Sequence, residues 1–174
     1  MAPDPKAEGE VPLDKIEERY TFYRLSDIDF DTASHTLRLL KRYRKLQIRF
    51  VIIRDAIISY ARPFSGSRGR SGSFYKFPLE LLPERHVALH EELMTFRNKA
   101  IAHSDIDFVN PTVANWSSDK GKWFPMSLRN FHNETKALAT KWKTILEMVT
   151  KIRVNLRTEC EAIEDKYFLD KRQV

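Results

Sequence analysis

The sequence predicts an all-α protein, a helical bundle of three long helices with additional short helices and two long irregular loops. Apolar residues recur every three or four positions over long stretches, the periodicity of helices that bury one face. Charged residues make up 31% of the chain and only 5 of its 174 residues are glycine, a composition typical of helical proteins. Hydrophobic residues, at 42%, are sufficient for the core of one domain. We therefore expect a disordered tail over residues 1–12 and a single domain over residues 13–174.

The first long helix is expected from about Thr32 to Ala61, where Arg62-Pro63 would end it. Before it, the pattern indicates a short helix over residues 13–23 and an acidic turn over residues 26–31. The apolar residues of the long helix alternate three and four positions apart, in a heptad-like seam of Leu39, Tyr43, Leu46, Phe50, Ile53, Ile57 and Tyr60.

Residues 63–78 are predicted to form the first irregular loop, which holds three of the 5 glycines. Two interpretations stay open for it. In one, Arg68 and Arg70 contact an RNA backbone while the neighbouring aromatic residues Phe74, Tyr75 and Phe77 stack on bases. In the other, the loop is a connector whose aromatic residues pack back onto the core.

The second long helix is expected to begin after Pro78 or Pro83 and to end near Ser104. Residues 105–126 are predicted to be irregular, and their tryptophans either stack on bases or fasten the loop to the bundle. The third long helix is expected over residues 127–166. Two apolar rows follow its length, one of Phe131, Leu138, Ile145 and Ile152, the other of Trp142, Val149, Leu156 and Ile163.

The second helix carries an arginine where an apolar residue is expected. On a helical wheel, Arg97 falls near the middle of the apolar arc and His103 at its edge. A guanidinium group is always charged, so it is costly on a buried face unless it is paired. Arg97 therefore has a buried acidic partner, or its face opens onto a cleft or a second subunit that binds an anion.

Five residues separate Arg97 from His103, and Asn98 directly follows the arginine. This pattern resembles the signature of HEPN domains, small all-helical modules found in many RNase toxins and defence proteins. The resemblance covers the motif helix directly, and the flanking helices only by architecture. It implies a metal-independent endoribonuclease with Arg97, Asn98 and His103 as catalytic residues. It also implies a homodimer that acts as a toxin or antiviral effector, with an antitoxin or regulatory protein as a possible further partner.

The chemistry of RNA cleavage suits these residue types. A histidine with a near-neutral pKa transfers protons, and the planar fork of an arginine binds the non-bridging phosphate oxygens. On a straight helix, however, Arg97 and His103 lie about 9 Å apart along the axis and about 120° apart around it, with Asn98 about 100° from Arg97. A distortion near the helix end, or a two-fold dimer that sets two motifs across one cleft, would complete the site.

Further RNA-binding residues are predicted to be Arg68, Arg70, His90 and Lys99, with His90 lining the same cleft as Arg97. The net charge of +6 is compatible with an RNA partner. The chain has one cysteine, so no cysteine cluster binds zinc, and His86 with His90 gives at most two neighbouring ligands. No motif for a nucleotide cofactor is present, and neither a metal nor a cofactor is expected. No apolar run is long enough to span a membrane, and we expect a cytoplasmic protein.

Two alternatives to the ribonuclease stay open. One is a non-catalytic HEPN-like module that binds RNA, a nucleotide or a protein partner. The other is a plain helical scaffold in which Arg97 forms an ion pair, for example with Glu17, Glu18 or Asp55. In that scaffold, His103 caps carbonyl groups at the end of the helix or packs in the core.

Overall fold

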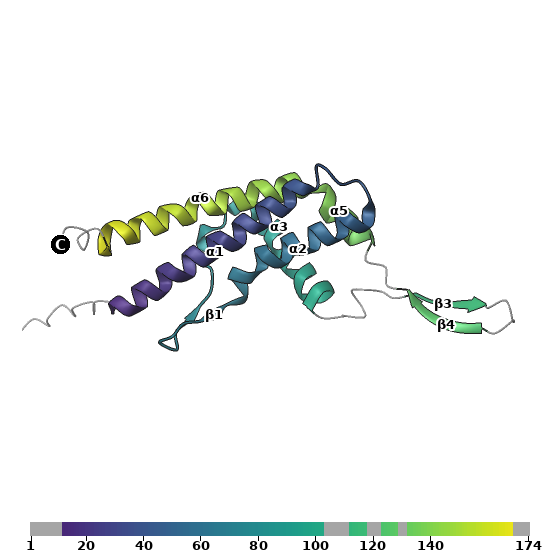
Figure 1. Ribbon diagram of the computed structural model, residues 1–174, viewed down its shortest axis with the longest axis horizontal. Helices are drawn as coiled ribbons and strands as arrows, with labels where there is room; N and C mark the ends of the chain where they lie inside the picture. Colours follow the sequence, from purple (N-terminus) through teal and green to yellow (C-terminus); the bar gives the residue numbers. More distant parts are fainter. Residues whose placement is uncertain (1–11, 103–111, 118–122, 129–131, 169–174) are drawn as a thin grey trace, which may run out of the picture.

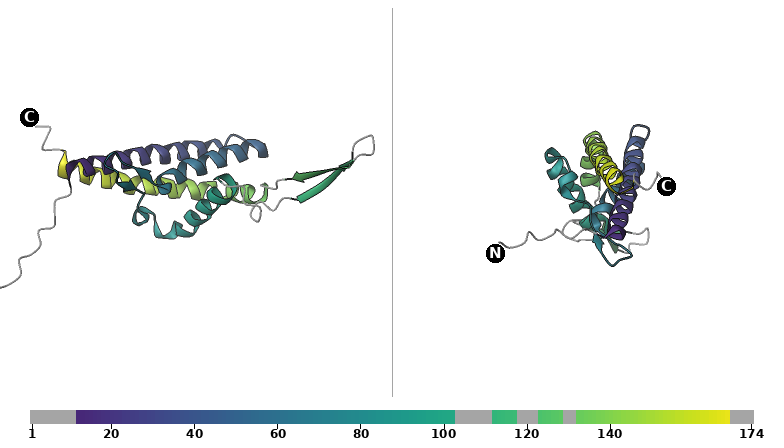
Figure 2. Two further views of the ribbon diagram at one scale, coloured as in Figure 1. Left: turned by 90° about the horizontal axis from the view of Figure 1, so that it is seen from below. Right: turned by 90° about the vertical axis from the view of Figure 1, so that its left-hand side faces the viewer.

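The fold is an all-α helical bundle, as the sequence predicts. The computed structural model describes residues 12–102, 112–117, 123–128 and 132–168, and the side chains of residues 12–99 and 136–168. Its frame consists of α1 (Leu13–Leu39), α2 (Leu46–Ser65) and α6 (Trp142–Tyr167). Helix α1 packs against both of the others, and Figures 1 and 2 show it antiparallel to each. The short α5 (His132–Thr140) packs on α2.

The core is the space enclosed by these helices. Helix α1 contributes Phe30 and Leu37, which are both 0% exposed, and α2 contributes Ile53, Ile57 and Tyr60, which are at most 1% exposed. The apolar rows predicted for the last helix are confirmed over most of their length, since the structure buries Leu138, Ile145, Val149, Ile152, Leu156 and Ile163. Burial of about 25 cal/mol per Å² of this apolar surface is the main stabilising contribution.

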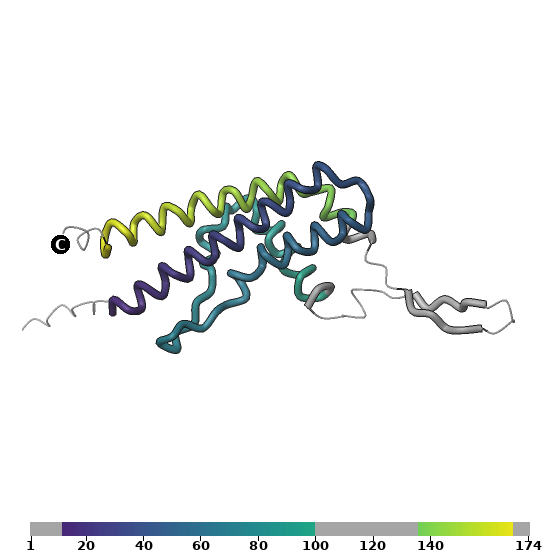
Figure 3. Tube along the Cα trace, in the orientation of Figure 1, coloured from purple at the N-terminus to yellow at the C-terminus, as the bar shows by residue number. Residues whose placement is uncertain are grey.

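The predicted division of the first helical region is wrong. Residues 26–31 form no turn, because α1 runs unbroken from Leu13 to Leu39. The chain turns instead over residues 40–45 (Figure 3), where one long helix was expected. Arg49 stabilises this turn by donating hydrogen bonds to the carbonyl oxygens of Leu40, Tyr43 and Ala139, at 3.0, 3.1 and 3.2 Å. The turn leaves the first seam residues, Leu39, Tyr43 and Leu46, 39%, 42% and 36% exposed.

Residues 63–78 are more ordered than an irregular loop. Helix α2 includes Pro63 in its last turn, and β1 (Ser67–Arg68) then pairs antiparallel with β2 (Phe74–Tyr75). Phe77 is 1% exposed and packs edge-on against Phe30 and Phe64. The interpretation that aromatic residues pack onto the core therefore holds for Phe77, whereas Phe74 is 67% exposed. We call residues 66–75 the hairpin.

The second long helix is shorter than predicted. Two 3₁₀ turns, η1 (Leu79–Leu81) and η2 (Glu84–His86), precede α3 (Val87–Phe96), because Pro78 and Pro83 interrupt regular helix. A π-helical segment, η3 (Arg97–Ala102), continues α3.

Residues 105–126 are not wholly irregular. Strand β3 (Thr112–Ser117) pairs antiparallel with β4 (Trp123–Leu128), with Thr112 opposite Leu128 and Ser117 opposite Trp123. The third long helix is also divided, because Lys141 separates α5 from α6 and residues 127–128 belong to β4. Residues 1–11 of the predicted tail, and Phe131, lie outside the described residues.

Candidate anion-binding site

The predicted motif lies where the backbone changes its winding. Helix α3 ends at Phe96, and the next six residues, Arg97–Ala102, form a π-helix. A π-helix makes i→i+5 hydrogen bonds, is rare, and occurs frequently at functional sites. A distortion near the end of the motif helix, one of the two alternatives considered for completing the site, is therefore present, and it begins at Arg97.

Within this turn the side chains of Arg97 and Asn98 meet. Arg97 is half-buried, and its Nη1 donates a hydrogen bond of 2.9 Å to Oδ1 of Asn98. The ideal-helix expectation that these two side chains point about 100° apart is therefore corrected. A neutral amide orients the guanidinium group but does not neutralise its charge.

No carboxylate among the residues described forms an ion pair with Arg97. Two of the acids proposed as its partners are engaged elsewhere. Glu18 accepts hydrogen bonds from the hairpin, and Asp55 accepts one of 3.1 Å from Thr36. The positive charge of Arg97 is thus available to an anion, within the part of the chain that the structure covers.

Arg97 lines a pocket of about 340 Å³, which we call the Arg97 pocket. The pocket lies between α1, the end of α2 and the start of the hairpin; its remaining lining residues are Phe22, Leu25, Ser26, Asp29, Arg62, Pro63, Ser65, Gly66 and Ser67. Arg62 donates to Asp29 at 3.2 Å, and their side chains are 62% and 25% exposed. The pocket thus has two guanidinium groups and one carboxylate. Of its serine hydroxyl groups, those of Ser26 and Ser65 donate to the carbonyl oxygens of Phe22 and Ala61, so the exposed Ser67 is the one that suits a phosphate oxygen.

Of the other predicted residues in this segment, the structure describes Lys99 but not His103. His103 lies outside the described residues, so its distance from Arg97 is not defined. Lys99 is exposed on the π turn, one residue beyond Asn98.

His90 lies in the core, not along the cleft where it was predicted. It is 8% exposed, and its Nδ1 forms a hydrogen bond of 2.7 Å with the hydroxyl group of Tyr60. Phe64 packs on its ring at 4.5 Å between centroids. Burial lowers the pKa of His90 and raises the pKa of Tyr60. The apolar face predicted to carry His90 is real, but it packs against α2.

His86 is buried too, at 4% exposure, and burial followed by the charge of Arg85 lowers its pKa. Its Nε2 has no hydrogen-bond partner within the described segments. Burial therefore disfavours the charged form of both histidines.

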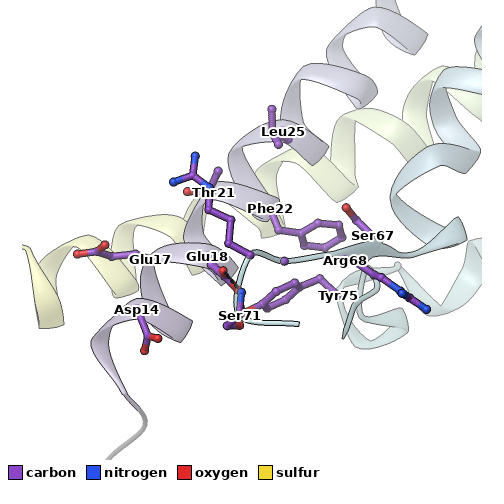
Figure 4. A pocket seen from close by; sticks show the side chains of 12 residues that line it. Asp14, Glu17, Glu18, Thr21, Phe22, Leu25, Ser67, Arg68, Ser71 and Tyr75 are labelled. Atoms are coloured by element: carbon purple, nitrogen blue, oxygen red, sulfur yellow. Dashed lines mark hydrogen bonds between the residues drawn. The ribbon is translucent and has the colours of Figure 1, made fainter. Parts of the chain in front are cut away.

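Arg68 and Arg70 lie on the exposed side of the hairpin, which is fastened to α1 by one carboxylate. Glu18 accepts hydrogen bonds from the Ser71 amide and hydroxyl groups, at 2.8 and 2.7 Å, and from the Tyr75 hydroxyl at 3.0 Å. The Ser71 hydrogen bonds lower the pKa of Glu18. A second pocket, of about 660 Å³, lies between the hairpin and the first turns of α1 (Figure 4). We call it the hairpin pocket.

Sequence reasoning found Arg97 and Asn98 but missed Arg62 and Asp29. The Arg62-Pro63 pair indicated only a helix end, and Asp29 belonged to a predicted turn. These two residues are 33 positions apart, so no local pattern connects them. The one sequence signal at Asp29 was its place in the acidic stretch of residues 26–31, which indicated a turn.

Comparison with models of protein families, with curated proteins and with solved structures found no match to this chain. The likeness to HEPN domains thus rests on the motif and on the helical architecture. No helix in the described part of the chain combines the length and apolar character needed to cross a membrane.

Proposed function

We propose that this protein is a metal-independent endoribonuclease of the HEPN type. The observation that supports the proposal is the half-buried Arg97, oriented by Asn98 and without a carboxylate partner among the described residues, in a pocket that also contains Arg62. A cation in such a position binds a phosphate group well, because solvent screens it incompletely and its planar fork matches phosphate geometry.

In the proposed reaction Arg97 binds the non-bridging oxygens of the scissile phosphate. The 2′-oxygen of the substrate bonds to phosphorus as the bond to the 5′-oxygen breaks, which leaves a 2′,3′-cyclic phosphate and a 5′-hydroxyl group. His103 accepts the 2′-hydroxyl proton or donates a proton to the departing 5′-oxygen. The proposal includes a homodimer, in which the histidine of a second copy performs the other transfer, and a role as a toxin or antiviral effector.

A second candidate is a non-catalytic module that binds RNA through the same pocket. It is favoured by one observation: no histidine is among the described residues that line the Arg97 pocket. Binding needs only the arginines, whereas cleavage also requires a group that transfers protons. In this second function, Arg97→Ala weakens RNA binding and no RNA is cut.

The test is RNA cleavage by the purified protein in excess EDTA, with analysis of the product ends. Wild type is compared with Arg97→Ala, His103→Ala and the control Arg85→Ala, whose side chain is 61% exposed and paired with Glu147. The proposal expects cyclic phosphate ends from wild type and the control, and a loss of at least about 100-fold in the other two variants. Full activity of either variant would exclude catalysis by that residue, and RNA binding without cleavage by wild type would favour the module.

Sedimentation of the wild-type protein tests the homodimer separately. If the protein is a monomer at concentrations at which it cleaves RNA, the shared site is contradicted. The role of Arg97 does not depend on this result and is decided by the cleavage test.

A further inference from the structure

The Arg97 pocket and the hairpin pocket are neighbours. Phe22 and Leu25 of α1 and Ser67 of the hairpin line both of them. Because they share these lining residues, the two pockets adjoin along α1, and we call the surface that they span, from Arg97 to Asp14 and Arg70, the groove. The hydrogen bonds of Glu18 to Ser71 and Tyr75 hold its two walls together.

The hairpin and α1 contribute charged residues of opposite sign to this groove. The hairpin wall carries Arg68 and Arg70, which are exposed and form no ion pair with any residue that the structure describes. The α1 wall carries Asp14 and Glu17. Figure 4 shows Arg68 extending away from both of these carboxylates.

An aromatic surface lies between the two walls. The half-buried ring of Phe22 stacks on Tyr75 at 5.8 Å between centroids, with 27° between the ring planes. Both rings line the hairpin pocket, and Phe22 also lines the Arg97 pocket. Aromatic side chains next to basic ones are the usual means of binding unpaired bases and their backbone.

We propose that this groove binds a short single-stranded RNA segment adjacent to the phosphate held by Arg97. The backbone follows Arg68 and Arg70 along the hairpin, one base stacks near Phe22, and the bases face α1. This inference rests on the proposed function, because it extends the substrate from the phosphate at Arg97.

The acidic wall gives the groove a base preference. Carboxylates accept hydrogen bonds from exocyclic amino groups, such as N4 of cytosine. Uracil has a carbonyl oxygen at that position, which Asp14 and Glu17 repel. Glu18 is excluded from this role because the hairpin occupies it. Cytosine-rich single strands should therefore bind more tightly than uracil-rich ones.

The experiment measures binding, so it is independent of catalysis. Fluorescence anisotropy follows labelled eight-nucleotide 2′-O-methyl oligocytidine and oligouridine, which have no free 2′-hydroxyl group to attack phosphorus. Wild type should bind oligocytidine more tightly than oligouridine. The double variant Arg68→Ala/Arg70→Ala should lose about tenfold in affinity, and the slope of log affinity against log salt should become shallower by about 1.4, because two phosphate contacts are removed.

Two further variants sharpen the test. Arg85→Ala/Arg157→Ala, whose side chains are 61% and 59% exposed, is the matched loss of two surface charges and should bind like wild type. The double variant Asp14→Asn/Glu17→Gln should bind both oligonucleotides, with a smaller difference in affinity between oligocytidine and oligouridine than wild type shows. Circular dichroism verifies that each variant remains helical.

Unchanged binding by the Arg68/Arg70 double variant, or no binding of either oligonucleotide to wild type, would overturn the proposal. Equal affinities for cytosine and uracil would overturn the arrangement with the bases facing α1. Binding without RNA cleavage would leave the groove supported while the proposed ribonuclease fails. Cleavage of RNA by wild type, together with oligonucleotide binding that does not depend on Arg68 and Arg70, would support the proposed ribonuclease and overturn the groove.

Discussion

Two arginines of this protein sit partly buried on helices, in very different surroundings. Arg153, on α6, has a side chain that is 17% exposed. Its Nε donates to Asp27 at 2.6 Å and its Nη1 donates to Asp31. Arg97 is half-buried at the start of the π turn, and an amide oxygen is its hydrogen-bond partner among the described residues.

The difference separates a structural cation from one available for binding. The hydrogen bond to Asp27 raises the pKa of Arg153, and the two carboxylates satisfy its charge while joining α6 to α1. Arg97 is oriented by the neutral amide of Asn98, and no carboxylate in the described part of the chain compensates its charge. A buried arginine is therefore informative about function only after its partners are known.

The largest effect on stability is expected for Arg153→Ala. Its loss leaves Asp27 and Asp31 as like charges one helical turn apart, so the free energy of unfolding should fall by about 2 kcal/mol. Urea unfolding monitored by circular dichroism measures the change. Arg157→Ala is the control, because its contact with Asp27 is 4.0 Å long and its side chain is 59% exposed; it should cost less than about 1 kcal/mol. Equal losses in both variants would mean that the Arg153 network is not structural.

Acid should destabilise the fold through its two buried histidines. Burial lowers the pKa of His90 and His86 in the folded protein, whereas the unfolded chain takes up these protons at a pH of about 6.5. Their contribution to stability is therefore full above that pH and is lost as the pH falls toward their folded pKa.

Thermal unfolding between pH 7 and pH 5 measures this loss. His90→Asn should make the melting temperature less sensitive to pH than that of wild type. A melting temperature of wild type that is constant over this range would contradict the prediction.

A smaller, local effect is expected for Gly69→Ala. The added Cβ would lie 2.2 Å from Oε2 of Glu18 and 2.7 Å from Cε2 of Tyr75, so these side chains must shift and the hydrogen bonds of Glu18 to the hairpin are weakened. We expect about 1 kcal/mol of local destabilisation and about fivefold faster tryptic cleavage after Arg68 and Arg70. Gly72→Asn is the control, since nothing lies within 4 Å of the Cβ and asparagine tolerates its φ of +81°. Identical cleavage rates would show that the close approach to Glu18 is not required.

The smallest effect on stability is expected for Arg97→Ala. The variant removes a hydrogen bond to an exposed amide, so the free energy of unfolding should change by at most about 0.5 kcal/mol. Urea unfolding beside Arg153→Ala gives the direct comparison. A loss as large as that of Arg153→Ala would indicate a structural ion pair and favour the scaffold interpretation over an anion site.

The sequence could predict features that depend on one helix, but not those that depend on contacts between distant residues. The apolar rows of α6 were predictable because periodicity within one helix decides which residues it buries, as for Ile152 and Leu156. The turn at residues 40–45 was not, because Arg49 stabilises it partly through Ala139, a residue 90 positions away. Arg97 stood out as a charge on an apolar arc. Its pocket did not, because Asp29 and Arg62 meet only after α1 and α2 have packed.

The unbroken length of α1 has a consequence for how this chain tolerates change. The same helix presents Glu18 to the hairpin, Phe22 and Asp29 to the groove, and Asp27 to Arg153. Inserting one residue after Phe22 would rotate everything beyond it by about 100° and shift it by about 1.5 Å. The contacts of α1 with the hairpin and with α6 could then no longer form together, because each set would need a different orientation of the same straight helix. A point substitution in α1 therefore disturbs one contact, whereas an insertion or deletion disturbs several contacts at once and is not tolerated.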